Sequence, residues 1–203
     1  IFEEVGRIYG YDNIVLPKHM KMSVNATPSP DPEAVKNHIS NFLASNGFTE
    51  IMNNSLTKGE YYEGLSSLPA AECVRIVNPL SQDLNVMRQS LVPGGLEVVA
   101  YNVNRQIPFV KTFEYGSVYK RLADRSGETL AGYEEHQNFC LVLSGTPEKC
   151  WNNPGGKSSF YQLKSYVELL VTRYGAALYK MWTDAAPTDV YSGGLVYMLR
   201  GQR

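Results

Sequence analysis

The spacing of apolar residues at the start of the chain predicts a short helix. Glu3, Glu4 and Arg7 share one helical face, and Gly10 is placed to end the helix. The opposite face is apolar and consists of Ile1, Phe2, Val5, Ile8 and Tyr9. We therefore expect residues 1–16 to be the C-terminal tail of a preceding domain, and the chain to be a piece of a longer protein.

A stretch with several prolines predicts a linker over residues 17–32. Proline fixes φ and lacks an N–H donor, which favours an extended connector over a packed element. The main domain is predicted over residues 33–203, and its first helix has Asp31 as N-cap and Pro32 at the first helical position. Its buried stripe is Val35, Ile39, Phe42 and Leu43, and Gly47 ends it.

Beyond Gly47 the pattern alternates between strands and two further helices. One helix follows Pro93, and the other begins at the capping box formed by Ser159 and Gln162 and continues to Tyr174. Residues 120–137 are polar and predict a loop, and Gly116 indicates a bulge or a close approach. Strands are expected at residues 48–56, 74–77, 109–119, 139–143, 177–182 and 195–199. Because strands outnumber long crossovers, we predict an α+β fold with a mostly antiparallel sheet flanked by helices.

Composition narrows the class of protein. The 203 residues suit one sizeable domain with a short appendage, and the net charge of −1 argues against broad electrostatic binding of nucleic acid. Cys73, Cys140 and Cys150 have no CxxC spacing, so they predict reduced, buried thiols instead of a zinc site or a disulfide framework. No apolar run approaches the ~20 residues of a membrane span. We expect a cytoplasmic protein without a membrane partner.

Familiar catalytic motifs are missing from the sequence. The segment Gly156-Lys157-Ser158 imitates the end of a phosphate-binding loop, but Trp151 stands where that loop requires its first glycine. There is also no GxGxxG, no HExxH and no nucleophile elbow. The histidines are far apart in sequence, which is typical of surface or hydrogen-bonded core residues; they are His19, His38 and His136.

A series of short motifs resembles a known family. The segments are IFEEVGRIYGYDNI from Ile1, NPLS from Asn78, MRQSLVPG from Met87, NVNR from Asn102 and FEYGSVY from Phe113, followed by Trp151 and FYQLK from Phe160. In this order and at these separations they resemble the core domain of the phenylalanyl-tRNA synthetase β subunit. The resemblance implies a class II aminoacyl-tRNA synthetase core. It also implies a heterotetramer of two α and two β subunits that attaches phenylalanine to tRNA(Phe) using ATP and Mg²⁺.

The resemblance also implies that this domain is not catalytic. Class II synthetases hold the α-phosphate of ATP with an arginine and a nearby acidic residue on a strand hairpin. Here Lys120 stands where the arginine is expected, and no acid lies two positions later. Lysine offers a point charge instead of a planar fork. We therefore assign no catalytic or cofactor-binding residue, expect no cofactor on this piece alone, and expect the α subunit to do the chemistry.

Two groups of polar residues are candidates for other roles. Arg88, Arg105 and Glu114 are polar residues within apolar elements. They predict either a remnant site or subunit contact, or else an internal salt bridge or a solvated edge, and we favour the second pair of alternatives. In the family, an acidic run that ends in a Glu-Glu pair is associated with Mg²⁺, and the matching residues are Glu3 and Glu4. Without the preceding acids we expect weak metal binding or none, as for exposed helix residues, with Glu3 placed to pair with Arg7.

The sequence therefore leaves three alternative functions open. The first is a non-catalytic core domain that packs on the α subunit and supports its active site and the placement of tRNA(Phe). The second is a self-sufficient class II-type ATP-dependent ligase in which Arg88 or Arg121 replaces the missing clamp. The third is a binding module for RNA or a peptide, whose surface is drawn from Tyr61, Tyr62, Arg121 and Arg125. Editing of mischarged tRNA belongs to a region of the family before Ile1.

Overall fold

A computed structural model of the chain describes residues 1–15, 19, 21–23, 30–122, 130–149, 151, 155–175, 181–186 and 189–199. The chain forms two compact units, Ile1–Val35 and Lys36–Arg203, and each is described by itself. The proposed linker of residues 17–32 lies largely outside the described residues, so the three predicted domain ranges stay predictions. Among the described residues, no helix is both long and apolar enough to cross a membrane.

The first unit carries the predicted N-terminal helix, α1 (Phe2–Tyr9). Gly10 ends it with φ of 87°, a left-handed conformation that glycine adopts without strain, and its N–H donates to the carbonyl of Gly6. A 3₁₀ turn, η1 (Tyr11–Asn13), follows. The apolar face of α1 is exposed within this unit, including Phe2 and Ile8.

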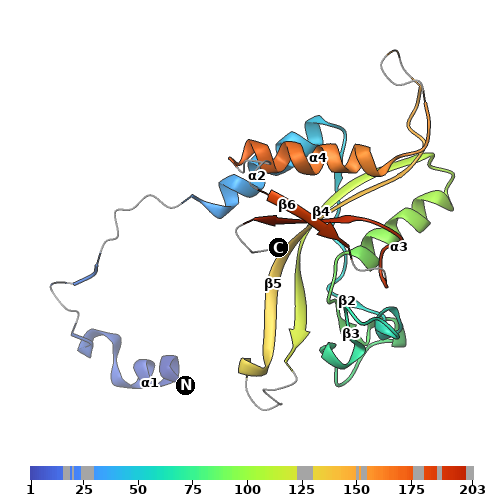
Figure 1. Ribbon diagram of the computed structural model, residues 1–203. Helices are drawn as coiled ribbons and strands as arrows, with labels where there is room; N and C mark the ends of the chain where they lie inside the picture. Colours follow the sequence, from blue (N-terminus) through green and yellow to red (C-terminus); the bar gives the residue numbers. More distant parts are fainter. Residues whose placement is uncertain are drawn as a thin grey trace. The chain divides into compact units, whose positions relative to one another are not determined.

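The second unit is built on a mixed three-stranded sheet (Figure 1). Its strands are β1 (Thr49–Glu50), β4 (Phe109–Arg121) and β5 (Tyr133–Gly145), in the order β1-β4-β5. β4 and β5 form a long antiparallel pair from Phe109 opposite Gly145 to Arg121 opposite Tyr133, whereas β1 is parallel to β4. The α+β class is thus confirmed, in a sheet that contains both strand orientations.

Helices cover the two faces of the sheet. Successive side chains of a strand point to opposite faces, so Phe113 and Thr112 face opposite sides. The helices α2 (Pro32–Ser45) and α4 (Phe160–Arg173) pack on the face of Phe113, where Leu43, Phe48, Phe113 and Leu170 form the main core. The helix α3 (Val92–Val103) lies on the other face, where Gly95 comes so close to Val142 that a Cβ would collide with it.

A smaller lobe lies between β1 and α3 in the sequence. Its strands β2 (Leu56–Thr57) and β3 (Val86–Met87) are antiparallel, and its 3₁₀ turns are η2 (Gly59–Tyr62), η3 (Ala70–Glu72) and η4 (Gln82–Leu84). Tyr62, Cys73 and Val86 form its own core. Near the C-terminus, β6 (Met181–Ala185) and β7 (Leu195–Leu199) form an antiparallel pair.

Most predicted elements are present, with different bounds. Ser159 caps α4 as expected, since its Oγ accepts a hydrogen bond from the N–H of Gln162 at 3.3 Å. The predicted strand over residues 48–56 is wrong in extent, because only β1 and the first residue of β2 belong to strands there. In place of the strand over residues 74–77 there is one isolated bridge, from Arg75 to Val86. Residues 177–180 of a predicted strand lie outside the described residues.

The loop predicted over residues 120–137 is wrong in part. Lys120 and Arg121 continue β4, and Tyr133–Gln137 belong to β5. Both strand segments carry polar, exposed side chains, so they lack the alternation from which strands are predicted. Their pairing depends on backbone hydrogen bonds, which do not require a buried face. A 3₁₀ turn, η5 (Leu130–Gly132), precedes β5.

Candidate functional site

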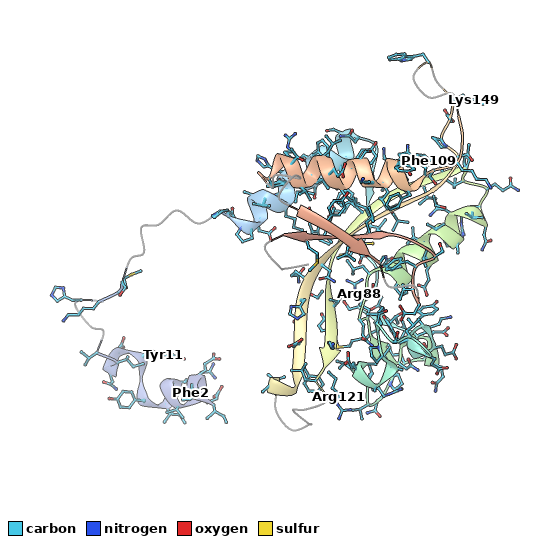
Figure 2. The ribbon with its side chains drawn as sticks, viewed as in Figure 1. Phe2, Tyr11, Arg88, Phe109, Arg121 and Lys149 are labelled. Carbon is cyan, nitrogen blue, oxygen red and sulfur yellow. The ribbon has the colours of Figure 1, made fainter. Side chains whose placement is uncertain are left out.

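The most deeply buried charged residues are Arg88 and Glu114. Arg88 follows β3, Glu114 lies in the middle of β4, and Arg88 Nη1 is 2.7 Å from Glu114 Oε1. Their side chains are only 7% and 2% exposed. In Figure 2, Arg88 lies where the small lobe meets the long hairpin. The internal salt bridge favoured from the sequence is therefore confirmed for these two residues.

Further hydrogen bonds complete the environment of this pair. Asn53 donates from its backbone N–H to Glu114 Oε1 at 3.1 Å and from Nδ2 to Oε2 at 2.7 Å. Arg88 Nε donates to the carbonyl of Ser117 at 2.9 Å. A buried ion pair is stable only when its remaining polar atoms are also bonded. We call Asn53, Arg88, Glu114 and Ser117 the buried cluster; it connects β4 to the small lobe and to the segment after β1.

Gly116 makes room for the buried cluster. An added Cβ at this position would collide with the guanidinium of Arg88 and crowd Leu91. Of the two readings of Gly116, a bulge or a close approach, the structure shows the close approach. The sequence marked Arg88, Glu114 and Gly116 as unusual, but it did not identify Asn53, because an asparagine between short strands has no distinctive spacing.

Arg105 behaves differently from Arg88. Its guanidinium lies over the ring of Tyr101, with Cζ 3.4 Å from the ring centroid, and its Nη1 donates to the carbonyl of Tyr101 at 3.3 Å. Both residues are exposed at the C-terminal end of α3. Of the two structural alternatives, Arg105 therefore adopts the solvated edge, and local contacts stabilise this cation at an exposed helix end.

The two basic residues at the end of β4 have different environments. Lys120 Nζ is 2.8 Å from Glu72 Oε2, so this cation is paired with the small lobe. Arg121 is exposed at the last position of β4. Arg88 forms an ion pair with Glu114 and donates a hydrogen bond to the carbonyl of Ser117. Among the residues considered for gripping a nucleotide, the structure thus leaves Arg121 at the surface and Arg88 in the interior.

Glu3 and Glu4 lie in the first turn of α1, and both are exposed. Glu4 Oε2 is 3.9 Å from Arg7 Nη1, so the loose pair joins Glu4 to Arg7 and not Glu3 to Arg7. Within the described part of the chain, no group of three or more His, Cys, Asp or Glu residues is placed to hold a metal ion. The assignment of Glu3 and Glu4 as metal ligands stays a prediction.

The tyrosines considered for a binding surface are not equivalent. Tyr62 is completely buried, and its hydroxyl accepts a hydrogen bond from the N–H of Gln89 at 3.0 Å. Tyr61 is at the surface, and its hydroxyl donates to Glu97 Oε1 at 2.5 Å, which raises the pKa of Tyr61 to about 12. Tyr62 therefore cannot contribute to an exposed aromatic platform, and Arg125 lies outside the described residues.

The thiols are not arranged for nucleophilic chemistry. Burial raises the pKa of Cys140 to about 11, with a smaller contribution from Glu114, and burial also raises the pKa of Cys73. Thiolates are the reactive form of cysteine, so the raised pKa of both groups disfavours their reaction near neutral pH. Both are free thiols, as predicted, while Cys150 lies outside the described residues.

Comparison with known proteins identifies the family. The family model for the phenylalanyl tRNA synthetase beta chain CLM domain matches residues 17–194. The chain is 37% identical over 205 aligned residues to the phenylalanine–tRNA ligase beta subunit of Bacteroides fragilis, covering 99% of this chain and 25% of that protein. The corresponding subunit of Porphyromonas gingivalis is 36% identical, over 96% of this chain and 24% of that protein. The chain thus spans about a quarter of the length of these relatives.

A solved structure supports the fold. A pyrrolysyl tRNA synthetase from Desulfitobacterium hafniense superposes with a TM-score of 0.51 at 14% identity, covering 83% of this chain and 55% of that chain. This likeness concerns the fold alone. The match to the family model over most of the sequence shows that the chain belongs to the phenylalanyl-tRNA synthetase beta chain family, in the CLM domain of that family.

Proposed function

We propose that this chain is a non-catalytic core domain of a phenylalanine–tRNA ligase, the enzyme that attaches phenylalanine to tRNA(Phe) with ATP. In this role it packs on the α subunit and supports the active site of that subunit and the placement of the tRNA. The observation that supports the proposal is the buried cluster: the guanidinium of Arg88, one of the two arginines that the rival ligase function could use for ATP, is bonded to Glu114 instead. The choice of phenylalanine–tRNA ligase as the enzyme rests on the family relationship.

The fold proposed for this role is a class II synthetase core. The long antiparallel pair of β4 and β5, covered by helices on both faces, supports it, as does the likeness to a pyrrolysyl tRNA synthetase. We further propose that the core domain covers residues 33–203 and the linker residues 17–32, so that residues 1–16 belong to a preceding domain. The same proposal places the assembly in the cytoplasm.

The loop of residues 77–80 is our candidate for the contact with the α subunit. It contains Asn78, Pro79 and Leu80 of the Asn-Pro-Leu-Ser motif, and the side chains of Val77 and Leu80 are 92% and 94% exposed. Apolar side chains grouped on an exposed loop are typical of a surface that a partner covers. Buried apolar side chains carry much of the energy of such interfaces.

Co-purification with the α subunit of the same enzyme tests this interface. We expect the wild-type chain to elute with the α subunit, and the Val77→Asp/Leu80→Asp variant to elute separately. Leu130→Asp is the matched control, because Leu130 is equally exposed on a different turn and we expect its variant to be retained. Retention of the double variant as strongly as wild type would exclude the 77–80 loop as the contact.

An ATP–pyrophosphate exchange assay tests whether the chain alone is catalytically inactive. We expect no phenylalanine-dependent ATP–pyrophosphate exchange by the 203-residue chain alone, and restored exchange when the α subunit is supplied in its native assembly. Exchange by the chain alone, or tight Mg²⁺-dependent binding of ATP in calorimetry, would favour the self-sufficient ligase. Binding of tRNA(Phe) by the chain alone that weakens steeply with salt would favour the RNA-binding module.

The Mg²⁺ proposal concerns Glu3 and Glu4. Mg²⁺ takes six oxygen ligands in near-octahedral geometry, and carboxylates suit this hard cation. Two exposed carboxylates, one of them loosely paired with Arg7, can supply only part of such a shell. We therefore expect no saturable Mg²⁺ binding by the chain alone in calorimetry, and a contribution from Glu3 and Glu4 only where further acids complete the shell.

A further inference from the structure

A cavity of about 690 Å³ lies between the small lobe, α3 and the segment before β7. Its volume is within the range of small-molecule sites. One wall is a face of α3, where Val92, Leu96 and Ala100 recur every four residues. The other walls contain Tyr61, Tyr62, Leu65 and Leu68 of the small lobe and residues 189–193. We call this space the Glu97 cavity.

The segment at residues 189–193 is fixed to the small lobe by Asp189. Asp189 Oδ2 accepts hydrogen bonds from the N–H groups of Ser66 and Ser67 at 2.9 and 2.8 Å, and both serine hydroxyls also donate to this carboxylate. These bonds lower the pKa of Asp189 to about 2, so it stays ionised at neutral pH. The wall formed by Val190 and Tyr191 is therefore held in place at one end.

The charged residues that line the Glu97 cavity are all acidic. Its lining contains two carboxylates, Glu97 and Asp189, and no lysine, arginine or histidine. Asp189 is already bonded to the serines, whereas Glu97 accepts from Tyr61 at Oε1, and an ionised carboxylate can accept further donors on its two oxygens. A site with apolar walls and a single-sign rim attracts ligands of the opposite charge. Glu97 is thus the group that can bind an incoming cation.

We propose that the Glu97 cavity binds a small ligand that combines an apolar body with a protonated amine. The body fills the space against Leu96, Ala100 and Leu68, and the ammonium pairs with the carboxylate of Glu97 beside Tyr61. The ammonium replaces part of its hydration with a charge-assisted hydrogen bond, while the apolar body leaves water. This binding activity is separate from the proposed contact with the α subunit, since it uses none of residues 77–80.

Three probes with one body and different head groups test the charge requirement. We would titrate 4-phenylbutylamine, 4-phenylbutanol and 4-phenylbutyrate into the 203-residue chain and follow backbone amide shifts by NMR. We expect the amine to bind about tenfold more tightly than the alcohol, the effect of one hydrogen bond to a charged group, and the butyrate to bind most weakly. Equal affinity of the amine and the alcohol, or no binding of any probe at millimolar concentration, would overturn the proposal.

Variants then locate the site. Glu97→Gln removes the charge from an exposed helix position, and we expect it to bring the amine and the alcohol within about twofold of each other. Glu63→Gln is the matched control, because Glu63 is exposed nearby but does not line the cavity; we expect it to keep the preference. Ala100→Trp fills the cavity and is expected to abolish binding of all three probes. Unchanged amine affinity in either Glu97→Gln or Ala100→Trp would also refute the assignment.

Discussion

Replacing Glu114 by Gln is the sharpest test of the buried cluster. The substitution keeps the shape of the side chain but removes its charge, so the guanidinium of Arg88 is left in the interior without a counterion. The new amide also presents N–H donors to Asn53 Nδ2 or Arg88 Nη1, which are themselves donors. One of the present hydrogen bonds is therefore lost as well as the ion pair.

The expected cost follows from the burial of the pair. Breaking a buried ion pair by removing one partner costs about 3–5 kcal/mol, because an uncompensated charge remains. Domains have free energies of unfolding of about 5–15 kcal/mol, so this loss is a large share of the total. With a urea m value of about 2 kcal/mol/M, the unfolding midpoint is expected to fall by about 2 M.

Equilibrium unfolding in urea, followed by far-UV circular dichroism, measures this loss. Glu72→Gln is the matched control, because it breaks the more exposed Lys120–Glu72 pair, and we expect it to cost no more than about 1 kcal/mol. The double variant Arg88→Met/Glu114→Gln removes both charges and is expected to be destabilised by less than the sum of the two single variants. A cost for Glu114→Gln no larger than that for Glu72→Gln would refute the argument.

Three further predictions follow from the same structure. Gly116→Ala pushes a methyl group into the guanidinium of Arg88, so we expect it to lower the free energy of unfolding by at least about 2 kcal/mol in urea titrations. Gly193→Ala, where the added methyl meets nothing, is expected to be nearly neutral, and an equal cost at both glycines would contradict this reason. The lowered pKa of Asp189 stabilises the fold above the usual value of 3.8, and this contribution is lost as the pH falls towards about 2. Asp189→Asn is therefore expected to flatten the pH dependence of the melting temperature in that window, and an unchanged slope would refute it. Burial of Cys140 predicts that iodoacetamide at pH 8 labels it far more slowly in the native than in the urea-unfolded chain, as read by peptide mass spectrometry, and equal rates would contradict the burial.

Sequence reasoning succeeded where a side-chain pattern determines the element. The apolar stripe of α4 directly follows its Ser159 cap in the sequence, so both were visible without tertiary information. The same reasoning did not predict the end of β4 or the start of β5. Residues there, such as Lys120 and His136, face water, and the strands are paired through backbone groups. The two-residue strands β1 and β2 are too short to show any period.

The candidate site also combines features that the sequence indicates with contacts that only the fold reveals. Polar residues inside apolar elements singled out Arg88 and Glu114, but their pairing joins positions 26 residues apart and depends on Asn53, 61 residues from Glu114. Arg105 satisfied the same sequence criterion and yet stacks on Tyr101 at the surface. The sequence therefore shows that a charged residue in an apolar element needs a partner. Only the fold shows whether that partner is a buried carboxylate, as for Arg88, or a nearby aromatic ring, as for Arg105.

The buried cluster bears directly on the choice between the proposed functions. A guanidinium that clamps an α-phosphate must present its N–H groups to the ligand, whereas Arg88 uses Nε and Nη1 on Ser117 and Glu114. Turning Arg88 towards a nucleotide would leave the Glu114 carboxylate buried without its counterion, which costs about 3–5 kcal/mol. The guanidinium also lies where a Cβ of residue 116 would be, so it is closely packed against β4. Arg88 is therefore placed to stabilise the core, and this favours a scaffold over a ligase that uses Arg88 as its clamp.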